Sequence, residues 1–353
     1  MKNEKKAFVE VQFNWIFILV AGGLILFFFI SLISKQSKIA ETSSNIDSLE
    51  YIDKILSGTS MEVGTTRNIT INNLNVKVTE SLITLPNKKV EGKSLRNKIV
   101  FAPDLIKGNK LITHSLYWEI PYKTTPFLYL TSNEVRYILM NDTISADDDD
   151  LINRAYALLP EFTAKEIIPL GSLAQLEEKN NYEVRLIFFN REPPQIRYAI
   201  DSENLVTALN IIKLDDSADI DGYGRVNFYR REGTVFVLKN SAFYLKKETL
   251  LGAIVTDTPE YYQENMRKAF VKLNAMTNIL IIKTTRLNEL SSATPGSKCP
   301  DIYTQILPAL LSINDITKNM QMTQQSFSTI YQNSKYIELY QGDLERESCP
   351  YLY

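Results

Sequence analysis

The chain has 353 residues, of which 44% are hydrophobic, and its formal net charge is -2 with a pI near 5.8. This composition is typical of a globular protein with a substantial core, in one or two domains, and not of a disordered chain. The near-neutral charge argues against nucleic acid as a partner, because nucleic-acid binding depends on clustered Lys and Arg. With only 13 glycines and one histidine, His114, the chain has few of the residues from which phosphate loops and metal sites are built.

The longest apolar run extends from Trp15 to Ser34 and contains no charged residue. A helix rises about 1.5 Å per residue, so this run reaches across the roughly 30 Å hydrocarbon core of a bilayer. It predicts a transmembrane helix at residues 15–34, preceded by a cytoplasmic tail at residues 1–14. The run is longer than the apolar core of a cleaved signal peptide, and Lys35 and Lys38 follow it closely, so the pattern favours an uncleaved anchor.

Flanking lysines are nearly balanced across this run and specify its orientation weakly. The two cysteines, Cys299 and Cys349, both lie in the C-terminal segment. One disulfide in an oxidising compartment is one reading, and two separate buried thiols are the other. The sequons at Asn68 and Asn141 are compatible with an external face. Together these features predict a single-pass protein of the cell membrane, with the N-terminus inside and the C-terminal domain outside.

After the apolar run, residues 35–58 carry apolar side chains at helical spacing, which predicts an amphipathic juxtamembrane stalk ending at Gly58. The stalk can pack on its own ectodomain or pair with a second copy. From Met61 to Val78 the apolar period becomes two, which predicts a β-hairpin turning at Asn72-Asn73. Further strands are expected at 98–101, 116–120, 127–130 and 135–140.

Strands and short helices alternate beyond Met140. The pattern predicts helices at 151–159 and 173–178 and strands at 163–168, 182–189, 206–212, 225–229 and 234–238, the last two joined as a hairpin through Arg230–Gly233. Tyr182–Phe189 is apolar on both faces, as in a strand covered on both sides. The expected fold class is therefore α/β, with a mixed-sheet ectodomain at residues 59–290.

The chain becomes helical from Pro259, although Ile279–Ile282 fits either a helix or a final strand. A Ser-, Thr-, Pro- and Gly-rich loop follows at 291–298, and then a helix that opens at Cys299-Pro300 and is expected to be interrupted at Pro308. A longer helix precedes Cys349. Residues 291–353 are thus predicted to form a C-terminal helical segment, which a Cys299–Cys349 disulfide would close.

Two acidic stretches are candidate metal sites. The run Asp147–Asp150 has neither the spacing nor the distant Glu of a calcium loop and reads as the start of a helix. The loop with Asp215, Asp216, Asp219 and Asp221 is closer to a calcium loop in composition but also lacks the closing Glu. These four aspartates are weak metal candidates, and a divalent-metal hydrolase built on them is one alternative function.

Other candidates have simpler structural interpretations. His114 has no second histidine for a metal site and no identifiable nucleophile, so a hydrogen-bonded structural role is expected. Gly222-Tyr223-Gly224 lies outside the strand-to-helix context of a dinucleotide site and reads as a turn. Clustered tyrosines suit either a binding face or an ordinary core. No catalytic set and no cofactor site is identified, so an enzyme is the less favoured reading.

The N-terminal run Gln12–Phe17 into Ala21-Gly22-Gly23, with the closing Ser348–Tyr353, resembles a group of uncharacterised single-pass membrane proteins of small-genome (DPANN-type) archaea. This resemblance implies a cell-surface setting, an α/β ectodomain and a C-terminal disulfide, and it brings no activity with it. Lys5–Phe8 also resembles the processed leader of an archaeal pilin-like subunit, although Glu10 is displaced from its pilin position. The expected function is a structural or binding role for a membrane-anchored extracytoplasmic protein, whose partners are the lipid bilayer and a cell-surface protein or a second copy.

Overall fold

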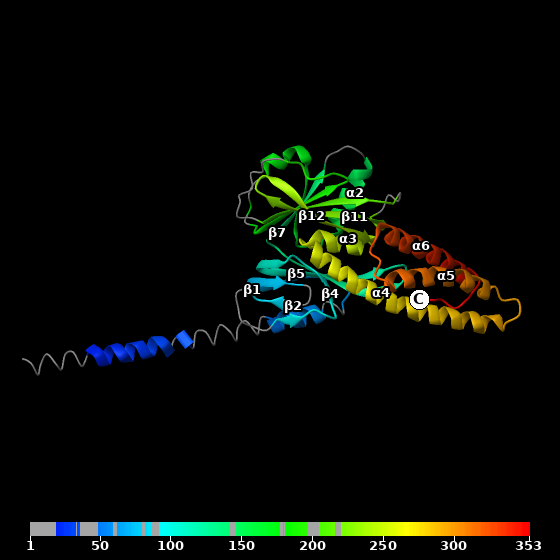
Figure 1. Cartoon of the computed structure of the whole chain (residues 1–353), viewed down its shortest axis with the longest axis horizontal. Helices are drawn as coiled ribbons and strands as arrows, with labels where there is room; N and C mark the ends of the chain where they lie inside the picture. The colour runs from blue at the N-terminus through cyan, green and yellow to red at the C-terminus, as the bar shows by residue number, and fades with distance from the viewer. Residues whose placement is uncertain are drawn as a thin grey trace, which may run out of the picture.

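The computed structural model describes residues 19–32, 34–35, 49–58, 62–79, 82–86, 92–141, 146–176, 179, 181–195, 205–215 and 220–353. It has two six-stranded sheets, one above the other, and a helical arm that projects from them (Figure 1). Sheets and C-terminal helices together give the α/β class with mixed sheets that the alternating pattern predicts.

The first sheet, sheet A, has the strand order β3-β2-β1-β5-β6-β4. Its neighbours are antiparallel except for β4 and β6, which run parallel. The bounds are β1 (Thr66–Val78), β2 (Leu82–Thr84), β3 (Lys93–Ser94), β4 (Ile99–Phe101), β5 (Leu105–Glu119) and β6 (Lys123–Ser132).

The second sheet, sheet B, has the order β12-β11-β10-β9-β7-β8. The four strands from β10 to β8 are parallel, and β11 and β12 are antiparallel additions at one edge. The bounds are β7 (Val135–Asn141), β8 (Ala164–Pro169), β9 (Glu183–Phe189), β10 (Leu205–Lys213), β11 (Tyr223–Glu232) and β12 (Val235–Leu245). All seven residues of β9 are buried, as predicted for a strand covered on both sides, and they include the charged Glu183 and Arg185.

Helices fill the space between and beside the sheets. α2 (Ala146–Leu158) links β7 to β8, and the 3-10 helix η1 (Leu170–Gln175) follows β8. α3 (Lys246–Val255) follows sheet B and contacts β4, β5 and β6 of sheet A, so it lies at the junction of the two sheets. The largest hydrophobic core joins the facing sides of both sheets with these helices and with the arm.

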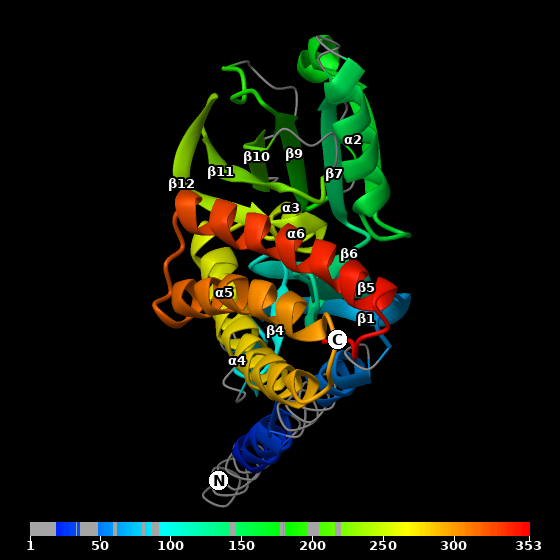
Figure 2. The ribbon, with the colours of Figure 1, turned by 90° about the vertical axis from the view of Figure 1, so that its right-hand side faces the viewer.

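The arm consists of α4 (Pro259–Ser292), α5 (Cys299–Lys318) and α6 (Gln324–Arg346) (Figure 2). α4 has 34 residues; it contacts β4, β6 and β12 and is also the principal neighbour of α5. A single helix therefore belongs to both the sheets and the arm.

The outer face of sheet A is covered by the helical residues 49–58, which bury Leu49, Ile52 and Leu56 against it. The stalk was expected either to pack on its own ectodomain or to pair with a second copy. Residues 49–58 pack on the chain's own α/β unit. Residues 36–48 of the predicted stalk lie outside the described residues.

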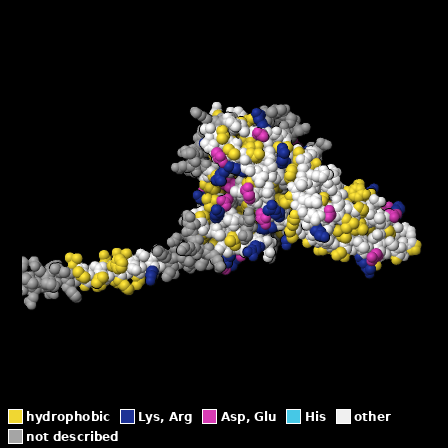
Figure 3. Space-filling model, viewed as in Figure 1, with side chains coloured by type: hydrophobic (Ala, Val, Ile, Leu, Met, Phe, Trp, Pro, Cys, Tyr) yellow, Lys and Arg dark blue, Asp and Glu magenta, His cyan; other side chains and the backbone are white. Residues whose placement is uncertain are grey.

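Residues 19–32 and 34–35 are helical, and their apolar side chains face outward (Figure 3). Leu24 is 66% exposed, Phe27 73% and Phe28 61%. Residues 15–18 and 33 of the predicted membrane helix lie outside the described residues. None of the helices within the described ranges combines the length and apolarity that crossing a membrane requires.

The hairpin predicted for Met61–Val78 is wrong, because Thr66–Val78 forms the single strand β1 along β5. The pairing shifts between Thr70 and Leu74, where β1 has additional residues relative to Lys110 and Gly108 of β5. Asn72-Asn73 therefore marks a β-bulge and not a turn. Such bulges accommodate extra residues without ending a strand.

The expected interruption at Pro308 is also wrong, because α5 continues through it. Pro308 is exposed, while Ile306, Leu310 and Ile313 around it are buried, so packing of the apolar face outweighs the missing hydrogen bond. The actual break lies at 319–323, where Met320 has a φ of 50° and Thr323 caps α6 by accepting the Ser326 N–H. Ile279–Ile282, for which the sequence was compatible with a helix or a strand, is helical within α4.

Candidate functional site

A cleft lies where sheet A meets the start of α4. It holds about 360 Å³ and is lined by Lys77, Thr79, Asp104, Thr258, Glu260 and Tyr261. Lys77 Nζ and Asp104 Oδ2 are 3.8 Å apart, with both side chains nearly half exposed. One cation and two carboxylates thus face the solvent, which suits a polar partner with charges of both signs.

Two buried ionisable side chains, Glu183 and Arg185, and a half-buried one, Asp257, lie beside this cleft. Glu183 and Arg185 are alternate residues of β9, so both point to the same face of sheet B, and each is 1% exposed. Asp257, in the connection from α3 to α4, accepts a hydrogen bond from the Asp104 N–H at 2.9 Å. Because Asp104 also lines the cleft, the buried cluster and the cleft are adjacent.

Arg185 caps the C-terminus of α3. Its guanidinium donates to the carbonyl oxygens of Ala253 and Ile254, both at 3.0 Å, and of Thr256 at 2.5 Å. These last carbonyls have no partner within their own helix, and a cation at that end also interacts favourably with the helix dipole. The side chain thereby connects sheet B to the helix at the junction.

Burial raises the pKa of Glu183 well above its usual range, and the nearby charge of Asp257 raises it further. Burial also raises the pKa of Asp257, against the opposing influence of Arg185. Among the described residues, Glu183 accepts one long contact, from Thr207 Oγ1 at 3.5 Å, which agrees with a neutral carboxyl group. The cluster therefore sets the Arg185 cation near Asp257, with Glu183 neutral, as expected of a structural junction.

Of the acidic loop, Asp215 and Asp221 are described. Asp221 pairs with Lys247 of α3 at 3.5 Å. The Asp215 carboxylate lies against Gly222, where an added Cβ would come within 2.0 Å of Oδ2, so a larger residue at 222 would displace this carboxylate. Asp216 and Asp219 lie outside the described residues. In the part of the chain that is described, no three His, Cys, Asp or Glu side chains are placed to hold a metal ion.

Sequence reasoning missed Glu248, which lies in the first turn of α3 near Asp221. It is 6% exposed, and its Oε2 has no hydrogen-bond partner among the described residues. Burial, with a contribution from the charge of Asp221, raises its pKa to about 7. No local pattern could have identified it, because α3 itself was not predicted.

The ionisation of Glu248 should make stability depend on pH. Its pKa is near 7 in the folded chain and 4.5 as a free group, so between these values the folded state binds more protons. The free energy of unfolding should therefore fall by roughly 3 kcal/mol as pH rises from 4.5 through 7, and then level off. Urea unfolding at pH 5, 6, 7 and 8 measures this. Glu248→Gln should remove that component and be more stable than the parent at pH 8.

Glu345→Gln, on an exposed position of α6, is the matched control and should keep the parent's pH profile. Parallel curves for the parent and Glu248→Gln would contradict the assigned ionisation.

The remaining candidates have structural partners. His114 Nδ1 is 2.9 Å from Thr66 Oγ1, its ring is near Tyr129, and burial lowers its pKa, in agreement with a hydrogen-bonded structural role.

The acidic run Asp147–Asp150 lies in α2, which begins at Ala146. Asp150 pairs with Arg154 at 2.8 Å, and the side chains of Asp147–Asp149 lie outside the described set. Gly222 forms a turn, whereas Tyr223 and Gly224 begin β11. Of the sequon residues, Asn68 is exposed on β1 and Asn141 half-buried at the end of β7.

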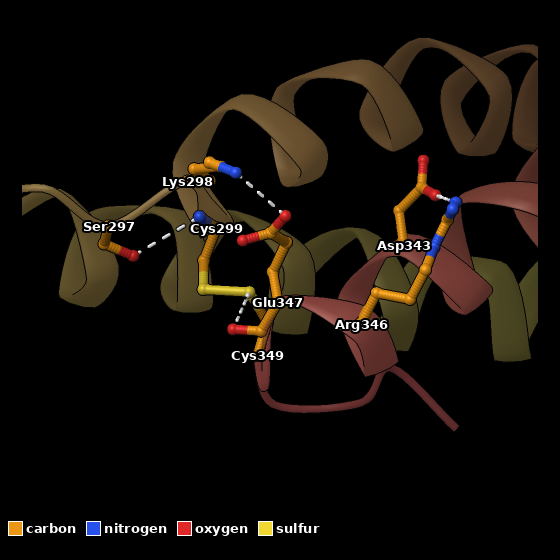
Figure 4. A network of polar contacts seen from close by, with 7 residues as sticks. All are labelled: Ser297, Lys298, Cys299, Asp343, Arg346, Glu347 and Cys349. Carbon is orange, nitrogen blue, oxygen red and sulfur yellow. Dashed lines mark hydrogen bonds and ion pairs between the residues drawn. A yellow bond between two sulfur atoms is a disulfide. The ribbon is translucent and has the colours of Figure 1, made fainter.

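Cys299 and Cys349 form a disulfide that joins the start of α5 to the end of α6 (Figure 4). Their Cα atoms are 5.7 Å apart, and the two residues are separated by 50 positions in sequence. Lys298 Nζ and Glu347 Oε1 form an exposed ion pair beside it at 3.0 Å. Of the two readings open for the cysteines, the structure has the disulfide.

No family model matches this chain, and no curated protein or solved structure is found that is similar to it.

Proposed function

We propose that the chain is a single-pass membrane protein whose α/β unit is held outside the cytoplasm and serves a structural or binding role. The observation that carries the proposal is the helix at 19–32, which presents large apolar side chains outward on all sides. A helix that is apolar all round is buried either in a large core or in a membrane. This helix lies within the apolar run from Trp15 to Ser34, and a helix of that length reaches across the hydrocarbon core of a bilayer.

The disulfide supports the proposed side of the membrane. Disulfides persist in oxidising compartments and are rare in the cytosol. Cys299 and Cys349 are the only cysteines of the chain, and they are paired with each other. Asn68, within its sequon, is exposed on β1 and accessible to a glycan. These features agree with the cell-surface setting that the archaeal resemblance implies.

A binding role is supported by the cleft between sheet A and α4. It offers charges of both signs, whereas behind it the half-buried Asp257 accepts the Asp104 N–H and the Glu183 carboxyl group is buried in β9. Such a surface suits reversible contact with a polar partner. The proposal therefore assigns the α/β unit to binding or scaffolding and not to a reaction.

Translation of the full chain into microsomes tests the proposed topology. Alkaline carbonate should leave the chain in the membrane fraction, and Asn68 should acquire a glycan. Thr70→Ala removes this sequon and should abolish modification at Asn68, while the membrane fraction stays unchanged. Extraction by carbonate would contradict the anchor. An anchored chain that is never glycosylated and whose α/β unit is digested by external protease would contradict the orientation.

A further inference from the structure

The last four residues fold back onto the arm after the disulfide. Leu352 is 1% exposed, although it is the penultimate residue of the chain. Tyr303 of α5 donates its hydroxyl to the Pro350 carbonyl at 2.8 Å, and Lys283 of α4 donates to the Leu352 carbonyl at 2.9 Å. The tail Pro350–Tyr353 therefore occupies a socket made by two helices of the arm.

The same tail also reaches the turn between β5 and β6 of sheet A. The Tyr353 ring lies 5.7 Å from the ring of Tyr122, edge to face. Tyr122 is buried, and its hydroxyl is 2.6 Å from Thr277 Oγ1 of α4. The tail thus contacts α4, α5 and sheet A together, at a point where the arm meets the sheets.

At the base of the tail the disulfide is accompanied by one strained residue, a backbone hydrogen bond and an exposed ion pair. Ser348 has a φ of 57°, a left-handed conformation that is unfavourable for a residue other than glycine. The Cys349 N–H bonds the Leu344 carbonyl at 2.8 Å, which closes α6. The Lys298–Glu347 ion pair is solvent-exposed, and such pairs contribute little. The covalent bond holds Cys349 at the start of α5 and so raises the effective concentration of the tail at its socket, where Leu352 and the two hydrogen bonds complete the attachment.

We propose that the Cys299–Cys349 disulfide and the tail form a redox-controlled strap, which is closed when the cysteines are oxidised and open when they are reduced. The reductant is a dithiol: one thiolate attacks a disulfide sulfur and forms a mixed disulfide, and the second thiol displaces it. Both cysteines leave as thiols, and the reductant becomes the disulfide. Cys299 is half-buried, whereas Cys349 is 4% exposed, so Cys299 is the more exposed residue of the two. Opening exposes the Leu352 socket and the ring of Tyr122.

Hydrogen exchange by mass spectrometry on the full chain in detergent, with and without dithiothreitol, tests the strap. Reduction should accelerate exchange at residues 348–353 and 120–124 by roughly tenfold or more, and leave the β9 amides unchanged. The double variant Cys299→Ser, Cys349→Ser should show the same pattern without reductant. Leu352→Ala should accelerate the same amides while the disulfide remains intact, because it removes the side chain that fills the socket.

Two results would overturn the proposal. One is unchanged exchange at both segments when thiol labelling shows that both cysteines are free. The other is acceleration of the β9 amides together with the tail, which would make the disulfide a general stabiliser of the fold and not a local strap.

Discussion

Replacing Arg185 by methionine is expected to lower the free energy of unfolding by about 3–5 kcal/mol, because removing one partner leaves an uncompensated buried charge. Three backbone carbonyls at the end of α3 would lose their donor, and Asp257 would lose its cation. Methionine keeps much of the side-chain volume, so the loss reports electrostatics and hydrogen bonding more than an empty space. Equilibrium unfolding in urea at pH 7 measures the effect.

Glu183→Gln is the matched control on the same strand and the same face. Burial keeps the Glu183 carboxyl group neutral, and a glutamine amide is also neutral. The substitution should therefore lower the free energy of unfolding by less than about 1 kcal/mol. If Glu183→Gln were as costly as Arg185→Met, the carboxylate would be charged in the folded chain. The junction would then be an ion pair of Glu183 with Arg185.

The second large effect is expected at Phe101, where β4 meets α3 and α4. Its ring is fully buried and packs on Phe127, Tyr129 and Tyr262 at centroid distances of 5.3, 5.8 and 5.7 Å. Phe101→Ala should cost about 3–5 kcal/mol of unfolding free energy, because it removes apolar contacts and leaves a cavity. Thermal and urea unfolding both report this loss.

Gly252 of α3 makes this prediction specific. A Cβ at that position would lie 2.8 Å from Cδ1 of Phe101, so Gly252→Ala should cost about 1–3 kcal/mol through overpacking. In the Phe101→Ala background the same change should be much less costly, because the clashing ring is gone. Gly342→Ala, where nothing lies within 4 Å, should instead stabilise α6 by about 0.5–1 kcal/mol. Additive costs for residues 101 and 252 would contradict the contact.

Local sequence patterns correctly predicted the elements whose structure depends on residues close together in the chain. The apolar run at Tyr182–Phe189 indicated a strand covered on both faces, and β9 is such a strand. Amphipathic spacing indicated the C-terminal helices, and a Gly-containing turn indicated the β11–β12 hairpin. The two cysteines left a disulfide and separate thiols open, and only the three-dimensional structure decides between these readings.

Other features depend on contacts between distant segments. α3 was missed because Lys246–Val255 is short and apolar without strong periodicity, and its burial between the sheets favours the helix. Pro308 suggested a break that packing of α5 prevents. The Asn72-Asn73 signal is compatible with a turn or a bulge, and pairing with β5 decides for the bulge.

The candidate site was the least predictable part. Glu183, Arg185 and Asp257 look like ordinary charged residues in sequence, and only the meeting of β9, α3 and the β4–β5 connection brings them together, with Glu183 and Arg185 buried and Asp257 half-buried. Glu248 likewise approaches Asp221 only through the fold. Charged side chains are seldom buried, so composition alone gives no reason to expect such a cluster.

The length of α4 has a mechanical consequence. A helix of 34 residues extends about 51 Å, and here it runs from between the two sheets into the arm without interruption (Figure 1). No loop separates its two halves, so the arm has no hinge at its base. A force applied at the loop near Ser292 must either bend this helix or be transmitted along it to the junction beside Asp257. The arm therefore acts as a stiff lever.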